Sequence, residues 1–140
     1  MLKLDKRGLS EIEAVLATAI LAIGILSIVT LFPLVLKMAR MAEQETIASN
    51  LAQAKIEEVF SLNYDNIPIG TIEARHRLAS DPANPFYYYE REASSQLVDG
   101  TLANSGSDLG LKKITVIVHW QTPHLNLSKS LPITILISRK

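Results

Sequence analysis

The segment that decides the fold is residues 6–36, KRGLSEIEAVLATAILAIGILSIVTLFPLVL. From Ala14 to Leu36 it holds 23 residues without a charged side chain, and fourteen of these are Leu, Ile, Val or Phe. A helix rises about 1.5 Å per residue, so the run is roughly 34 Å long and sufficient to cross a hydrocarbon layer of about 30 Å. We therefore predict that residues 9–36 form a transmembrane helix.

Basic residues on either side of this run predict its orientation. Lys3, Lys6 and Arg7 precede it, whereas only Lys37 and Arg40 follow it closely. Because cytoplasmic flanks of membrane helices are enriched in Lys and Arg, we expect a cytoplasmic N-terminus and an extracytoplasmic remainder. The run is longer than the apolar region of a cleavable secretory signal, which spans roughly 7–15 residues. A plain single-pass membrane anchor explains the length and stays open as an alternative.

The composition excludes several classes of protein. The chain has 140 residues, 14 basic and 14 acidic side chains, and no cysteine. Balanced charge argues against nucleic-acid binding, and missing cysteine removes disulfides, thiolate metal sites and cysteine nucleophiles. Neither the dinucleotide fingerprint nor the P-loop occurs. The three histidines, His76, His119 and His124, do not have the spacing of a metal site. We predict no catalytic residue, cofactor or metal, and therefore no enzyme.

Residues 37–62 predict that the helix continues beyond the membrane as an amphipathic segment. They contain no proline or glycine and are rich in residues that favour helix. Pro33 is expected to kink the helix or melt a turn, because its ring removes a hydrogen bond. Apolar residues at helical spacing form a stripe that we expect to pack on the chain's own sheet. The stripe contains Met38, Met41, Ala48, Ala52, Ile56 and Val59, with Leu51 and Phe60 on its flanks.

Residues 63–140 predict a small antiparallel sheet. Turn-forming residues at 63–70 end the helix. A part of this size cannot bury a large core alone, so one face of the sheet should lie on the helix. The predicted fold class is α+β, a long N-terminal helix packed against a small antiparallel sheet. The predicted strands are Ile72–Leu78, Phe86–Ala93, Ile114–Gln121 and Leu131–Ser138, the last two joined as a hairpin through residues 122–129.

The run from Lys6 to Glu13, KRGLSEIE, followed by AVLATAILAIGILSIV, resembles the class III leader of type IV pilins and pseudopilins. The stretch ILAIGILSI and the strand-rich C-terminal part resemble PilV-type minor pilins and the I-type minor pseudopilins of type II secretion. This resemblance implies a pilin-like fold. It also implies that prepilin peptidase cuts after Gly8, removing residues 1–8 as a leader peptide, and that the new N-terminal Leu9 is methylated.

The resemblance implies a structural subunit of a type IV pilus, a fimbrium, or of a type II secretion-like filament. Such a subunit starts in the cytoplasmic (inner) membrane and then joins an extracytoplasmic filament. The implied partners are prepilin peptidase, other pilin or pseudopilin subunits, the inner-membrane assembly platform and membrane lipid. The sequence departs from the family pattern at Leu9, where phenylalanine is usual, and at Glu11, where an apolar residue is usual. Pro33 also lies three positions later than the helix proline of many major pilins.

Glu13 would be the fifth residue of the mature chain and is the glutamate that the family shares. A carboxylate beside an apolar helix costs a few kcal/mol unless it is paired. The free amine of Leu9, from the same or a neighbouring subunit, would pair with it. Such a pair would set the axial register, because a misplaced subunit leaves a buried unpaired charge. The alternative is that Glu13 only marks the end of the span at the level of the headgroups.

Two C-terminal features leave a binding role open. Tyr87, Tyr88 and Tyr89 lie in a predicted strand, where alternation allows at most two rings on one side. Residues 99–110 are rich in oxygen ligands of the kind that calcium prefers, but a connection between strands is the simpler interpretation. Three hypotheses follow: a structural filament subunit, a pilus-tip subunit for adhesion or binding, and a membrane-anchored domain that never polymerises.

Overall fold

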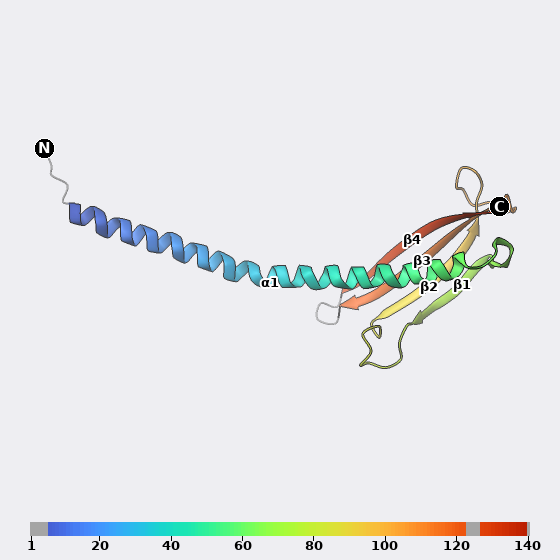
Figure 1. The fold of residues 1–140 in the computed structure, drawn as a ribbon, viewed down its shortest axis with the longest axis horizontal. Helices are drawn as coiled ribbons and strands as arrows, with labels where there is room; N and C mark the ends of the chain where they lie inside the picture. Colours follow the sequence, from blue (N-terminus) through green and yellow to red (C-terminus); the bar gives the residue numbers. More distant parts are fainter. Residues whose placement is uncertain (1–5, 123–126, 140) are drawn as a thin grey trace. The chain divides into compact units, whose positions relative to one another are not determined.

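The computed structural model describes residues 6–122 and 127–139. The elements, in order, are α1 (Lys6–Phe60), the 3-10 turn η1 (Tyr64–Asn66), β1 (Gly70–Arg77), β2 (Tyr89–Leu97), β3 (Leu111–Thr122) and β4 (Leu127–Ser138) (Figure 1). The chain divides between Glu43 and Gln44 into two compact units. The first is the N-terminal part of α1, and the second combines the rest of α1 with the sheet. The fold is α+β, as predicted.

Helix α1 is longer and less interrupted than the sequence suggested. It covers Lys6–Phe60, whereas we predicted a helix from Leu9 to Leu62. The helix is unbroken at Pro33, so the melted turn considered as an alternative does not form. Proline lacks only its own N–H, and the hydrogen bonds of the neighbouring turns remain possible. Ser61 and Leu62 instead close the helix as a turn, with the Ser61 N–H donating to the carbonyls of Glu57 and Glu58 at 3.1 and 3.2 Å.

The four strands form one antiparallel sheet in the order β1-β2-β3-β4. Strands β3 and β4 pair without interruption from Leu111 opposite Ser138 to Thr122 opposite Leu127, which confirms the predicted hairpin. The connecting residues 123–126, with His124 among them, lie outside the described residues. Pro132 lies on the edge strand β4, where a missing N–H does not interrupt the sheet. Strand β1 forms the other edge, and its pairing with β2 shifts register on both sides of Glu73.

The predicted strand Phe86–Ala93 was placed too early. Strand β2 begins at Tyr89, because a succession of turns occupies the residues before it. The N–H of Asn84 donates to the carbonyl of Asp81, that of Tyr87 to Asn84, and that of Tyr89 to Phe86, each at 3.0 Å. The strand also continues to Leu97 through polar residues. Pairing with β3 supports these residues, which the hydrophobic pattern alone did not identify.

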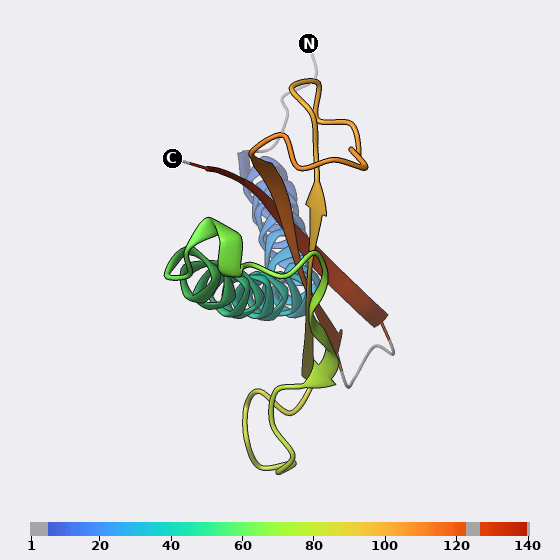
Figure 2. The same cartoon turned by 90° about the vertical axis from the view of Figure 1, so that its right-hand side faces the viewer.

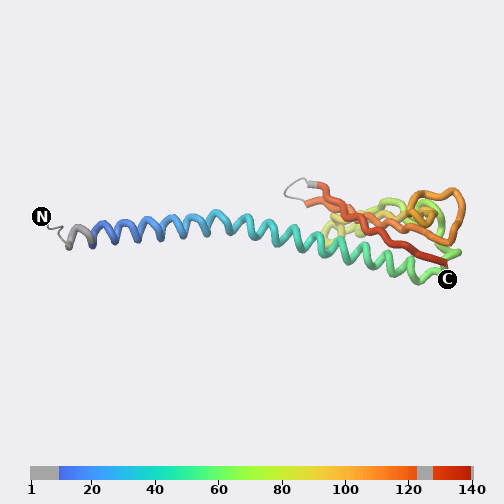
Figure 3. The backbone as a smooth tube through the Cα atoms, turned by 90° about the horizontal axis from the view of Figure 1, so that it is seen from above, coloured from blue at the N-terminus to red at the C-terminus, as the bar shows by residue number. Residues whose placement is uncertain are grey.

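The core of the second unit lies between α1 and one face of the sheet (Figures 2 and 3). Strand β3 contributes its alternate apolar residues, as predicted, and β4 adds partly buried ones. The predicted stripe is right in its C-terminal portion, whereas Met38 and Phe60 are exposed. Two alanines in the stripe let the helix approach the sheet closely. The buried apolar residues of α1 and β3 are Ala48, Ala52, Ile56, Val59, Ile114, Val116, Val118 and Trp120, and Ile67, Tyr89 and Ala93 complete the cluster.

Candidate functional site

The first unit exposes an apolar surface that none of its described residues, 6–43, covers. The large apolar side chains of residues 12–36 are 47–70% exposed. Within the described residues, α1 is the one helix long and apolar enough to cross a membrane. A soluble helix would bury at least one apolar stripe. The side chains of this segment therefore require an apolar environment supplied by lipid or by other molecules.

The polar side chains within this apolar segment are satisfied by the helix itself. The hydroxyl of Thr18 donates to the carbonyl of Ala14 at 2.8 Å, and that of Ser27 donates to Ile23 at 2.8 Å. Thr30 donates to the carbonyl of Ser27 at 2.9 Å. Hydroxyls that bond to their own backbone leave no unsatisfied donor for the hydrocarbon. The segment can therefore enter an apolar medium without leaving these groups unpaired.

The residues singled out at the start of the chain lie in the first turns of α1. Gly8 and Leu9 are both helical, so the bond between them is part of the helix in the uncut chain. Glu13 is exposed and has no ion pair or hydrogen bond with any residue in 6–122 or 127–139. Its carboxylate is thus available to a partner outside the described residues. The residue roles proposed for Gly8, Leu9 and Glu13 remain predictions.

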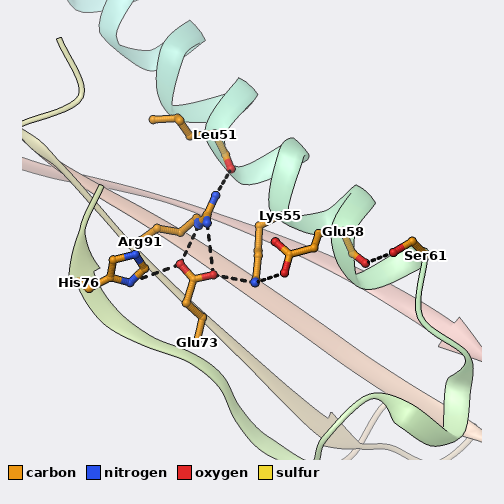
Figure 4. A network of polar contacts seen from close by, with 7 residues as sticks. All are labelled: Leu51, Lys55, Glu58, Ser61, Glu73, His76 and Arg91. Atoms are coloured by element: carbon orange, nitrogen blue, oxygen red, sulfur yellow. Dashed lines mark hydrogen bonds and ion pairs between the residues drawn. The ribbon is translucent and has the colours of Figure 1, made fainter. Parts of the chain in front are cut away.

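A buried polar cluster joins α1 to the first two strands (Figure 4). Lys55 Nζ lies 2.8 Å from Glu73 Oε2 and 2.7 Å from Glu58 Oε1. The Arg91 guanidinium donates to both oxygens of Glu73, at 2.9 and 3.3 Å, and to the carbonyl of Leu51 at 3.1 Å. The side chains of Lys55, Glu73 and Arg91 are only 9%, 12% and 15% exposed. One carboxylate therefore holds two cations beneath the helix.

The cluster shifts the pKa values of its members toward the charged forms. Burial disfavours ionisation of Glu73, but hydrogen bonds from Arg91 and Lys55 outweigh it and hold the pKa of Glu73 below its ordinary value. Burial likewise opposes the charge of Lys55, but hydrogen bonds to Glu58 and Glu73 raise the pKa of Lys55 overall. Such an arrangement fixes the helix on the sheet. Every group in it is engaged by a neighbour, which fits a structural role better than catalysis.

Sequence reasoning missed this cluster, although the sequence contained its signal. Lys55 follows Ala52 by three residues and precedes Val59 by four, which places it on the buried face of the helix. Arg91 lies between Tyr89 and Ala93 in β2, and alternation directs all three toward the helix. Glu73 was not predictable in this way, because the two register shifts of β1 decide which of its residues face inward.

A second polar network ties the C-terminal end of the sheet to the turn after α1. The Tyr64 hydroxyl donates to Asp108 at 2.6 Å, and Arg139 donates to Asp108 and Asp65, each at 2.8 Å. Lys112 Nζ and the Arg139 guanidinium lie 4.3 and 4.7 Å from the centre of the Tyr64 ring. Burial and the hydrogen bond to Asp108 raise the pKa of Tyr64 to about 12. In a chain without cysteine, this network fastens the last strand noncovalently.

The carboxylates of the oxygen-rich loop at 99–110 accept hydrogen bonds from groups of the protein itself. Asp99 accepts hydrogen bonds from the N–H groups of Thr101 and Ala103, at 2.8 and 3.0 Å. Asp108 accepts from Tyr64, Gly110 and Arg139. Among the described residues no group of three or more acidic, histidine or cysteine side chains is placed to hold a metal ion. The geometry therefore describes a hydrogen-bonded connection between β2 and β3.

The three tyrosines have different environments, contrary to their predicted alternation in one strand. Tyr89 starts β2, is buried, and stacks on Trp120 with ring centres 6.4 Å apart. Tyr87 and Tyr88 lie in the preceding turn, and their rings meet edge to face at 5.2 Å. Tyr88 is 44% exposed.

The two described histidines lie beside different carboxylates. His119 Nε2 lies 3.0 Å from Glu92 Oε1, and His76 Nδ1 lies 3.4 Å from Glu73 Oε1.

No protein-family model, curated protein or solved structure matches this chain.

Proposed function

We propose that this chain is a minor pilin or pseudopilin, a structural subunit of a type IV pilus or of a type II secretion-like filament. The observation that carries the proposal is the exposed apolar half of α1, which follows directly on the leader-like residues KRGLSEIE. The same helix continues into a half that is packed on a sheet. The pilin-like fold proposed from the sequence fits this combination of one long helix and a four-stranded antiparallel sheet.

The apolar half of α1 is suited to two successive environments, first lipid and then the helices of other subunits. Its fourteen Leu, Ile, Val and Phe residues contribute roughly −4 to −8 kcal/mol to membrane insertion, at about −0.3 to −0.6 kcal/mol each. The subunit is first held in the cytoplasmic (inner) membrane with its N-terminus in the cytoplasm and its sheet outside. It then leaves the lipid and packs the same apolar surface against the helices of other subunits. The assembly platform in the inner membrane would supply the force for this transfer.

Cleavage after Gly8 and the charge of Glu13 complete the proposal. Prepilin peptidase removes residues 1–8 and exposes the amine of Leu9, which becomes methylated. This amine is positively charged, and it is the charge that cleavage adds to this region. Glu13 has no partner in the described chain, so an amine of its own or a neighbouring subunit satisfies it. Pairing in a low-dielectric bundle then fixes the axial position of each subunit.

The decisive experiment is the mass of the mature protein. The chain is expressed in cells that contain a prepilin peptidase, extracted from the membrane and examined by intact mass and N-terminal peptide spectrometry. The expected product begins at methylated Leu9. The Gly8→Val variant should stay uncut, because a branched side chain replaces the hydrogen of glycine beside the scissile bond. Ser10→Ala is the matched control and should be cut normally. An intact Met1 in the parent chain would contradict the proposal.

The alternative is a single-pass anchored domain that never polymerises, which the length and apolar character of α1 also favour. Crosslinking in membranes and in sheared extracellular material separates the two. A filament subunit gives ladders of crosslinked copies or mixed species in the sheared fraction. An anchored domain stays in the membrane fraction with its full mass. The choice between pilus and secretion filament then follows from which other subunits are crosslinked to it.

A further inference from the structure

A small hollow of about 140 Å³ lies at one end of the sheet in the second unit. It is built where the end of β1, the turn before β2, the end of β3 and the start of β4 meet. Its wall combines cations, aromatic rings and neutral hydrogen-bonding groups. Arg75, Arg77 and Glu90 supply its charged side chains, and Tyr87 and Tyr88 supply its aromatic rings.

The hollow carries positive charge that the chain does not neutralise. Arg75 is paired with Glu90 at 2.6 Å. Arg77, by contrast, has no acidic partner anywhere in the described ranges 6–122 and 127–139. The guanidinium of Arg77 lies 4.3 Å from the centre of the Tyr87 ring, which holds it in place. A guanidinium with no acidic partner beside a hollow favours an anionic ligand.

The aromatic side chains make the hollow suitable for more than a simple anion. Tyr87 and Tyr88 meet at an interplanar angle of 90°, so their rings are held in a defined orientation, and Tyr88 remains exposed. Trp120 borders the hollow, and its ring is buried against Tyr89 on the core side of the sheet. The hollow also contains the side chains of Gln121, Ser128 and Ser130, which can bond to hydroxyl groups.

A second, more open hollow adjoins the first. The two share Arg75, Arg77, Tyr87 and Glu90, so these residues form a wall between them. The second hollow adds His76 and Ser80. A ligand that occupies both would pass across Arg77 and Tyr87. The surface is therefore suited to an extended ligand with repeated polar groups, and its anchoring point is the stacked arginine.

We propose that this hollow binds a carboxylated saccharide, such as one unit of an acidic polysaccharide. The guanidinium of Arg77 binds the carboxylate through paired hydrogen bonds. The tyrosine rings contact the apolar face of the sugar, while the serine and glutamine side chains bond to its hydroxyls. A bare anion would not use the rings, and a neutral sugar would not use the cations. Nucleic acid fits less well, because the chain has no basic excess.

The test uses the single tryptophan of the chain as a reporter, because Trp120 lines the hollow. The full chain in detergent micelles is titrated with trigalacturonate and followed by tryptophan fluorescence and, independently, by calorimetry. We expect saturable binding. Arg77→Gln should weaken it roughly tenfold to a hundredfold, as expected for a lost hydrogen bond to a charged group. Lys113→Gln is the matched control at the opposite end of β3 and should bind like the parent chain. Circular dichroism checks that both variants are folded.

Several outcomes would overturn the proposal. One is equal binding of maltotriose, a neutral trimer, and another is full competition by inorganic phosphate at the same concentration. Tighter binding of a single-stranded oligonucleotide would assign the hollow to nucleic acid instead. Absence of both a fluorescence and a calorimetric response, or an unchanged affinity of the Arg77→Gln variant, would also contradict it. The site does not depend on the filament role, since the mass of the mature N-terminus is measured separately.

Discussion

The two halves of α1 belong to one unbroken helix, yet they bury their side chains in different ways. Residues 10–40 are exposed throughout, although most of them are apolar. Residues 44–60 are charged on one face and buried on the other, where Ala48, Ala52, Ile56 and Val59 pack on the sheet. The second half obtains its apolar environment from its own chain. The first half has no such cover among the described residues of its own unit, and under the proposed function lipid or other subunits supply it.

The two halves also differ in whether their charged side chains are paired within the chain. In the second half, Lys55 is buried but is paired with Glu73 and Glu58 within the same unit. In the first half, Glu13 is exposed and has no partner among the described residues. A charge that is paired internally stabilises one fold. A charge that is left unpaired at the edge of an apolar surface is available for assembly, which is the role proposed for Glu13.

The largest expected effect comes from breaking the cluster that holds the second half on the sheet. Glu73→Ala leaves Lys55 and Arg91 buried without their shared carboxylate. We expect the free energy of unfolding to fall by about 3–5 kcal/mol, the usual cost of removing one partner of a buried ion pair. Urea unfolding of the full chain in micelles, followed by Trp120 fluorescence, measures it. Glu58→Ala is the control, because this partner of Lys55 is 63% exposed, and it should cost less than about 1 kcal/mol. Equal losses in the two variants would contradict the cluster's role.

The most direct comparison makes one substitution in each half. Ile56→Ala removes a side chain that is 6% exposed and should lower the free energy of unfolding of the sheet unit by about 2–5 kcal/mol. Ile25→Ala removes one that is 53% exposed and should leave that value unchanged. It should instead make the free energy of membrane insertion less favourable, by less than about 1 kcal/mol. Urea unfolding and a glycosylation-based insertion assay measure the two quantities. Destabilisation of the sheet by Ile25→Ala would show that the two halves are coupled.

A third change addresses the unpaired charge of the first half. Under the proposed filament role, Glu13→Ala should reduce incorporation into filaments roughly tenfold, because the register loses a pairing of the order of 1–2 kcal/mol. Membrane insertion should persist. Glu11→Ala is the matched control, since it removes a neighbouring carboxylate without removing the register pair. Immunoblots of sheared filaments against membrane fractions give the ratio. Unchanged incorporation of Glu13→Ala would leave the register role without support.

The smallest expected effect is alkaline loss of the C-terminal network. The pKa of Tyr64 is raised from 10.0 to about 12, first by burial and then by the hydrogen bond to Asp108. The folded state therefore favours the neutral phenol, so its contribution to stability is complete below pH 10 and is lost as pH rises toward 12. Tyr64→Phe should make the fall in stability across this range shallower while keeping the ring beside Lys112 and Arg139. The urea midpoints of the parent chain and of Tyr64→Phe, measured in parallel at several pH values, test this expectation. Identical slopes of midpoint against pH in the two proteins would refute the role assigned to Tyr64.

Local sequence pattern was sufficient for the order and type of the helix and strands and for the apolar half of α1. A run of 23 uncharged residues predicts a membrane-spanning length without any knowledge of the rest of the chain. Alternation in β3 correctly placed Ile114, Val116, Val118 and Trp120 on the buried face. Helical spacing correctly placed Ala48 to Val59 against the sheet. These features depend on side-chain periods of 3.6 and 2, which the sequence contains directly.

The start of β2, the polar cluster and the candidate ligand hollow were decided only by tertiary structure. The turns before Tyr89 removed Tyr87 and Tyr88 from the strand and placed them beside Arg77. Register shifts in β1 brought Glu73 beneath the helix, where Lys55 and Arg91 meet it. Each arrangement joins residues far apart in the sequence, so no local period encodes it. Which charges pair depends on which strands and turns come together, and burial then makes those pairs energetically decisive.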